Sequence, residues 1–312
     1  MNAQGGFSRR GWLLFGAMAL LWGVPYLFIS IAVESISPPA IVAGRTLIAA
    51  LLLLPFAIRG GALRAALRHW PWVLAFGIIE MAGPFVLLGH AEMTLPSGMT
   101  GLLVATVPLF AALIALGGGD RAVLRPSRSI GLLVGFLGVA IVVAGPGLFG
   151  GQVSLLAAGE VLLVAILYAI APFIVARKLN DVPSLGTIVL SLLMIGVIYL
   201  PIGILTQHEI PTLPSVGALL ALAVICTAVA FLAFFALIRE VGPVRAPLFT
   251  YVNPVVAIIL GAIVLAEPLT PGLLIGFPLI IVGCWFAATG GRFRPPASSA
   301  PELVPAPLPP AP

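Results

Sequence analysis

Charge is what this sequence lacks most. Only 8% of its 312 residues are charged, against about 25% in soluble domains, and 61% are hydrophobic. A soluble protein needs a polar shell around its core, so an apolar surplus of this size has to face lipid. The net charge of +5 does not indicate nucleic acid as a partner, because the 15 basic residues are scattered between apolar runs and form no basic stripe.

Cysteine is nearly absent, and recognisable enzyme motifs are missing. Cys226 and Cys284 both lie inside apolar runs, where a thiol behaves as a small hydrophobe, so neither a disulfide framework nor a zinc site is predicted. No His-Glu-x-x-His sequence, phosphate-binding loop or Cys/His cluster is present. Residues 117–120 match the Gly-x-Gly-Asp pattern of intramembrane aspartyl proteases, but the second aspartate, Asp181, falls in an expected loop. We therefore expect no enzyme activity, no metal and no cofactor.

Long apolar runs dominate the chain instead. A helix needs about 20 mostly apolar residues to span a bilayer, and cutting the chain at polar or Pro/Gly clusters leaves ten such runs. The sequence therefore predicts an all-α membrane protein with ten transmembrane helices. The expected spans are residues 12–32, 39–58, 70–90, 95–116, 128–146, 153–176, 185–205, 215–238, 246–266 and 272–290.

The basic residues test this count, because Lys and Arg collect in the cytoplasmic loops of membrane proteins. With the N-terminus inside, 14 of the 15 basic residues fall in cytoplasmic loops or termini. The outer loops then carry acidic residues and one histidine but no Lys or Arg. We therefore expect a multi-pass protein of the plasma or inner membrane with both termini in the cytoplasm.

The two halves of the chain align at a nearly constant offset of 145 or 146 residues. Chance matching in an apolar sequence is the alternative, but one offset shared by three separate helices favours duplication. Each half holds five of the ten expected spans. Because five is an odd number, the second half must enter the membrane from the opposite side, which produces the inverted repeat typical of secondary transporters. The matched pairs are Trp22 with Tyr168, Pro108 with Pro254, Gly131 with Gly276 and Gly138 with Gly283.

This organisation predicts four segments. A cytoplasmic N-terminus covers residues 1–10, the first five-helix repeat residues 11–146 and the second residues 153–290. The remaining segment, 295–312, holds eight prolines in 18 residues, so we expect a disordered cytoplasmic tail.

Motifs in both halves resemble EamA-type members of the drug/metabolite transporter superfamily. The second repeat is similar in Gly-Pro-Val-Arg-Ala at 242–246, Tyr-Val-Asn-Pro-Val-Val at 251–256 and Glu267 with Pro-Leu-Thr after it; the first is similar in Leu-Trp-Gly at 21–23, Arg45 and the 95–138 region. The resemblance covers residues 11–290. It implies a ten-helix permease, often an exporter of amino acids or other metabolites, with helices 1–4 and 6–9 around a central cavity. One departure is Gly117-Gly118-Gly119-Asp120, where family members usually carry a Glu at the end of helix 4.

Three ionisable residues, Arg45, Glu80 and Glu160, lie well inside expected spans. A charge near the bilayer centre costs about 2.5–3.5 kcal/mol, so each should face a cavity or a partner. In one interpretation Arg45 binds an anionic group of a substrate, while Glu80 or Glu160 binds an ammonium group or accepts a coupling proton. In the other, Arg45 pairs with one of the acids and locks two helices together. The sequence leaves both interpretations open.

Two further sets of residues are candidates for the cavity or for packing alone. An intrahelical proline leaves a backbone carbonyl without its helical N–H donor. The helix can kink there, and the free carbonyl can bind substrate. Aromatic and amide side chains on cavity-facing helices can hold an apolar group or an organic cation. The prolines are Pro25, Pro84, Pro108, Pro172 and Pro254, and the side chains are Trp22, Tyr26, Tyr168, Tyr251 and Asn253.

These features together predict a secondary transporter. We expect an exporter of amino acids or related small metabolites or drugs that works by alternating access and could be coupled to protons. The alternative is a passive channel or facilitator for a small solute, in which the same charges set selectivity. A small-molecule substrate and the lipid bilayer are the expected partners, and the sequence is compatible with a monomer without fixing the oligomeric state.

Overall fold

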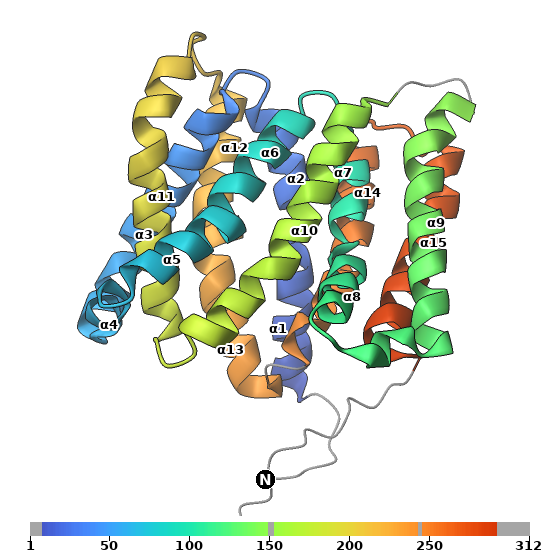
Figure 1. Ribbon diagram of the computed structural model, residues 1–312. Helices are drawn as coiled ribbons and strands as arrows, with labels where there is room; N and C mark the ends of the chain where they lie inside the picture. Colours follow the sequence, from blue (N-terminus) through green and yellow to red (C-terminus); the bar gives the residue numbers. More distant parts are fainter. Residues whose placement is uncertain (1–7, 149–152, 243–244, 292–312) are drawn as a thin grey trace, which may run out of the picture.

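The computed structural model describes residues 8–148, 153–242 and 245–291. Ten helices in this part are long and apolar enough to cross a membrane, and their ends agree with the expected spans to within three residues. They run alternately up and down beside one another (Figure 1). The prediction of an all-α protein with ten spans is confirmed, whereas the expected Pro-rich tail lies outside the described residues.

The first repeat contributes the first five spans. Below, the face of the molecule at which the first helix begins is called the terminal face, and the other is called the opposite face. In chain order the elements are α1 (Arg9–Leu21) and α2 (Pro25–Ala32); α3 (Pro38–Arg59), followed by short α4 (Ala62–Leu67); α5 (Trp70–Gly77), η1 (Ile78–Ala82) and α6 (Gly83–Ala91); α7 (Ser97–Val104) and α8 (Val107–Gly117), followed by η2 (Arg121–Leu124); and α9 (Pro126–Leu148).

The second repeat contributes the other five. Its elements are α10 (Leu155–Lys178); α11 (Ser184–Thr206); α12 (Leu213–Ala223), η3 (Val224–Val229) and α13 (Ala230–Val241); η4 (Ala246–Tyr251) and α14 (Asn253–Val264); and α15 (Pro271–Thr289). Both repeats interrupt their third span with a π-helical turn, η1 in one and η3 in the other, and the two turns begin 146 residues apart. Both also divide their fourth span near its middle, between α7 and α8 and between η4 and α14. Matched irregularities of this kind support duplication.

Packing between the repeats follows the two-fold relation that an inverted duplication requires. Three spans pack against their own counterparts: α3 against α11, α7 against α14, and α9 against α15. The first span packs against the eighth, through α2 with α12 and α1 with α13, and the related pair is α10 with α6 of the third span. Exchanging the repeats maps the first of these two contacts onto the second. The predicted inverted five-helix repeats are confirmed.

Glycines allow the closest of these approaches, between α9 and α15. A Cβ atom on Gly283 would collide with the backbone of Gly135, and one on Gly138 would lie 2.9 Å from the backbone nitrogen of Ile280. Helices in lipid associate through such small residues, because burial of apolar side chains brings no gain there. The pair stands at one end of the molecule (Figure 1).

Candidate functional site

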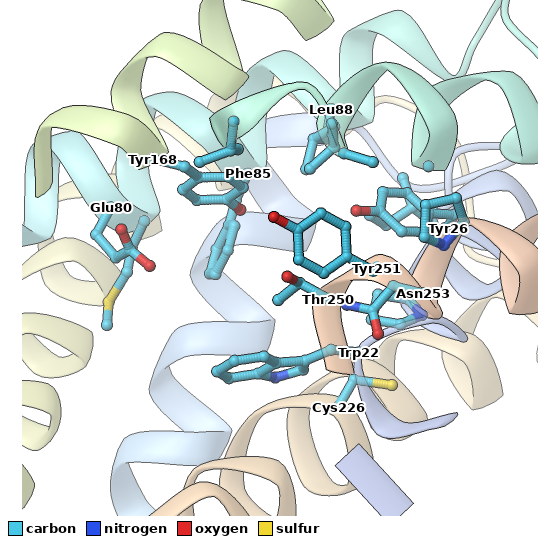
Figure 2. A pocket seen from close by; sticks show the side chains of 18 of the residues that line it. Trp22, Tyr26, Glu80, Phe85, Leu88, Tyr168, Cys226, Thr250, Tyr251 and Asn253 are labelled. Atoms are coloured by element: carbon cyan, nitrogen blue, oxygen red, sulfur yellow. The ribbon is translucent and has the colours of Figure 1, made fainter. Parts of the chain in front are cut away.

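A central cavity of about 270 Å³ lies between the two repeats. Its walls come from spans 1–4 of the first repeat and spans 6, 8 and 9 of the second, whereas the described residues of α9, α11 and α15 contribute none. Aromatic rings and a few polar groups converge on it (Figure 2). Its volume is close to the lower end of the roughly 300–1,000 Å³ range of small-molecule sites, so it suits a small metabolite.

Arg45 supplies the positive charge of this cavity from α3. Its side chain is buried, its Nε–H donates to Thr227 Oγ1 at 2.9 Å, and its guanidinium carbon lies 3.9 Å from the centre of the Phe85 ring. No carboxylate within 4.0 Å pairs with it in the described part of the chain. Since a guanidinium has five N–H donors, the groups at the Nη end remain available to a ligand.

Glu80 supplies the negative charge from the π-helical turn η1. A π-turn inserts one residue into a helix, is frequent at functional sites, and here turns the carboxylate of Glu80 toward the cavity. No side chain among the described residues hydrogen-bonds this carboxylate. The matching turn of the second repeat, η3, contributes Cys226 to the cavity wall and Thr227 to Arg45.

Three tyrosines complete the polar lining. Tyr26 comes from α2, Tyr168 from α10 and Tyr251 from the end of η4, and their rings stand around one space in Figure 2. Tyr26 and Tyr168 are both near enough to Arg45 to experience its charge, and Tyr168 also experiences that of Glu80. The Tyr168 hydroxyl therefore lies near both charges of the cavity.

Trp22 and Asn253 touch the cavity but are also held in packing contacts. The Trp22 ring lies 5.0 Å from that of Phe234 and 5.4 Å from that of Phe249, measured between centroids. The Asn253 amide, oriented to donate, reaches the carbonyl oxygens of Phe249 and Ala19 at 3.2 Å each, which ties the ninth span to the first. Both residues therefore stabilise the floor of the cavity.

The prolines mark where segments begin. Pro25, Pro84, Pro108 and Pro254 each occupy the first or second position of a new helical segment, α2, α6, α8 and α14 respectively. Pro172, in contrast, lies inside the continuous helix α10. Pro25, Pro108 and Pro254 follow breaks in their spans, where the N–H that proline lacks would have no helical acceptor, whereas Pro84 continues the helix from the π-turn η1. Pro25, Pro108 and Pro254 line the cavity, whereas Pro84 and Pro172 do not.

Glu160 is placed away from this lining. Its carboxylate oxygen Oε2 lies 2.8 Å from His90 Nδ1, and this contact joins α10 to α6 near the opposite face. The sequence contained no signal for the pair, because the two residues are 70 positions apart. Sequence reasoning also missed Thr227 and Phe85, the groups that orient Arg45; the one available hint was that Thr227 follows Cys226, the repeat partner of Glu80.

Glu267 joins the repeats at the opposite face. Its carboxylate accepts hydrogen bonds from the backbone N–H groups of Ser97, at 2.6 Å, and Gly98, at 3.0 Å. These are N–H groups in the first turn of α7 that have no helical acceptor, and a negative charge is favourable at that end of a helix. Its counterpart at the terminal face, Asp120, instead accepts from Ala122 N–H in its own turn.

The cavity is sealed toward the opposite face. Ile29 and Leu88, which line it at that end, are only 2% and 4% exposed. Toward the terminal face Thr250 lines it and is exposed, and α8 does not pack closely against η4 as α7 packs against α14, as far as these described segments go. The cavity is therefore accessible from the terminal face and closed toward the opposite face.

Ten spans in two inverted repeats, around a mostly apolar cavity that holds a few polar groups and is closed at one face, define a membrane transporter. The chain belongs to the EamA-like transporter family, whose model matches residues 9–144 and 155–289. It is 31% identical to the uncharacterized inner membrane transporter YedA of Escherichia coli K12 over 80% of this chain and 81% of that one. It is 29% identical to the uncharacterized transporter YvbV of Bacillus subtilis, over 91% and 93%. A solved crystal structure superposes with a TM-score of 0.63 at 22% identity, covering 91% and 99%, which shows a shared fold.

Proposed function

We propose that this transporter is a secondary carrier that exports a small zwitterionic metabolite of the amino-acid class in exchange for protons. The observation that carries the proposal is the cavity of about 270 Å³ that holds a guanidinium and a carboxylate, neither paired with an opposite charge of the described chain. In this assignment Arg45 binds the substrate carboxylate and Glu80 binds its ammonium group. Tyr26, Tyr168 and Tyr251 form the walls, and Trp22 and Asn253 support them.

Exchange follows from a single carboxylate that serves two ligands. An unpaired charge inside the membrane is costly, so the empty carrier has to neutralise the charge of Glu80 before the site changes sides. Either a proton or the substrate ammonium can do so, but not both together. A carrier that returns only with a proton and leaves only with substrate performs antiport.

The direction follows from the sidedness we assign to the molecule. Fourteen basic residues belong to the terminal face or the chain termini, which by the positive-inside rule supports a cytoplasmic location for that face. The relative YedA is named as an inner membrane transporter, which supports the inner membrane as the location. The accessible end of the cavity then opens toward the cytoplasm, where an exporter takes up its substrate.

Ligand chemistry tests the site. Purified protein is screened by thermal unfolding against amino acids and, for each stabilising compound, against the matching amine and the matching carboxylic acid. We expect stabilisation only when both charges are present on one molecule, because each charge of the cavity needs its own partner. Equal stabilisation by an amine alone would contradict the proposal.

Counterflow in proteoliposomes then separates a carrier from a channel. With the stabilising compound as radiolabelled probe, excess unlabelled compound inside the vesicles should accelerate uptake, since a loaded carrier returns faster than an empty one. Vesicles without protein and vesicles loaded with the matching amine serve as controls. Uptake that is unaffected by internal substrate would indicate the passive facilitator and refute alternating access.

A further inference from the structure

Glu92 is a buried acid outside the cavity that the transport proposal does not use. It follows the last residue of α6 at the opposite face and is only 6% exposed. Neither of its carboxylate oxygens has a hydrogen-bond partner in the described structure. Buried polar atoms are rarely left in this condition, because an unpaired charge in an apolar interior is costly. Such a group needs a ligand that the protein itself does not supply.

The groups facing Glu92 come from both repeats. Ser30 of α2 directs its hydroxyl and backbone N–H toward the carboxylate, without closing a hydrogen bond of normal geometry. Tyr26, one helical turn earlier on α2, experiences its charge, as does Glu267 of the second repeat. Elsewhere at this face, Glu160 of α10 is occupied by His90, and Glu34 is exposed to solvent.

Two carboxylates, Glu92 and Glu267, are therefore near enough at the opposite face to interact electrostatically. Glu267 accepts two backbone hydrogen bonds from α7. Burial raises the pKa of Glu92 well above its usual range, and the nearby charge of Glu267 raises that pKa further. The uncharged carboxyl is thus the form of Glu92 that fits the closed opposite face.

A metal ion does not suit this position. Hard cations such as Ca²⁺ take six to eight oxygen ligands, whereas Glu92 has near it only the Ser30 hydroxyl and the Glu267 carboxylate, which already accepts two backbone hydrogen bonds. The described residues also contain no group of three or more metal-binding side chains. A proton requires only the carboxylate itself.

We propose that Glu92 is a proton-binding site, distinct from the substrate cavity, whose protonation holds the opposite face closed. The proposal rests on the alternating access proposed above, since it assumes that this face opens. Opening would expose Glu92 to water and release its proton on that side, where the carboxylate is well solvated. Tyr26, which lines the cavity, interacts electrostatically with both Glu92 and Arg45, so it links this site to the cavity.

The size of the effect follows from linkage. A carboxyl that titrates near pH 4.3 in the open state, and higher in the closed state, favours the closed state at low pH. Between these two pKa values the closed-to-open ratio falls up to about tenfold for each unit of rising pH, because one proton is involved. Alkaline conditions should therefore open the opposite face.

Thiol labelling can follow this opening without any substrate. Leu95 is 3% exposed and packs at the opposite face, away from the cavity lining, so Leu95→Cys reports on that face alone. Cys226 and Cys284 are replaced by Ala, and labelling by a maleimide is measured from pH 5.5 to 8.5 in detergent. Met93→Cys, whose native side chain is 57% exposed, corrects for the pH dependence of the reagent.

We expect the corrected labelling rate to rise at least tenfold across this range, and Glu92→Gln to keep it low and independent of pH. Glu92→Asp restores a titratable group and should restore the rise, which distinguishes a proton site from a general packing defect. Unchanged pH dependence in Glu92→Gln, a flat profile in the parent, or a rise that follows Na⁺ instead of pH would each overturn the proposal. Because no substrate is present, these results stand apart from the counterflow test.

Discussion

Removing the Glu267 carboxylate should weaken the contact between the repeats at the opposite face. The substitution Glu267→Ala leaves the N–H groups of Ser97 and Gly98, at the start of α7, without the acceptor they have in this structure. Gly261 shows how closely this contact is built, because a Cβ atom there would collide with Glu267 Oε2 and lie 2.8 Å from Ser97 Oγ.

The size of the expected destabilisation follows from the two hydrogen bonds that Glu267 accepts. A hydrogen bond to a charged acceptor contributes about 1.5–3 kcal/mol, and a charge at a helix N-terminus adds about 0.3–1 kcal/mol. Glu267 is half-buried, so water replaces part of this loss, and we expect a destabilisation of about 2–4 kcal/mol for Glu267→Ala. Glu267→Gln keeps one carbonyl oxygen as an acceptor but loses the charge, and should cost about half as much.

Thermal unfolding of the purified protein in detergent measures the stability of each variant. The unfolding midpoint should fall in the order unaltered protein, Glu267→Gln, Glu267→Ala. Glu34→Ala is the matched control, because Glu34 is an exposed acid at the same face, and surface substitutions usually change stability by less than about 0.5 kcal/mol. A midpoint for Glu267→Ala equal to that of the control would refute the role given to these two hydrogen bonds.

The remaining predictions concern the cavity and the peripheral helix pair. Substrate affinity should rise with pH, because a protonated Glu80 cannot bind an ammonium group; Glu80→Gln should remove this pH dependence in a binding titration, whereas Glu160→Gln, outside the cavity, should retain it. An unaltered pH profile in Glu80→Gln would contradict the assignment. Gly283→Ala should destabilise the protein by about 1–3 kcal/mol through collision with Gly135, while Gly159→Ala, which meets nothing within 4 Å, should not lower the midpoint of thermal unfolding. Equal midpoints for the two glycine variants would show that α9 and α15 can separate at no cost.

The spans and the repeat could be read from the sequence for simple reasons. A bilayer excludes unpaired backbone groups, so each crossing requires about 20 apolar residues as a helix, and that requirement is visible in one dimension. Duplication preserves spacing even after most side chains have changed, which is why Pro108 and Pro254 still mark the fourth span of each repeat. By the same spacing Cys226 is the counterpart of Glu80 in the second repeat, and both residues line the cavity.

The partners of the charged residues were not readable in this way. Arg45, Glu80 and Glu160 had similar standing as charges inside spans, yet Glu160 contacts His90 and only the other two line the cavity. The π-helical turn at Glu80 shifts the side chains of that helix, and no regular periodicity predicts such a shift. Which face each charge presents therefore depended on the packing of the spans.

Glu92 illustrates the same division most clearly. By sequence it is an acid in an outer loop, one of several there, and its position just beyond an apolar run indicates a solvated group. The tertiary structure buries it, with Ser30 of α2 beside its carboxylate and the charge of Glu267 nearby. Hydropathy along the chain determined how many times this protein crosses the membrane. Which of its charged residues line the cavity or are buried at the opposite face depended instead on contacts between residues far apart in sequence.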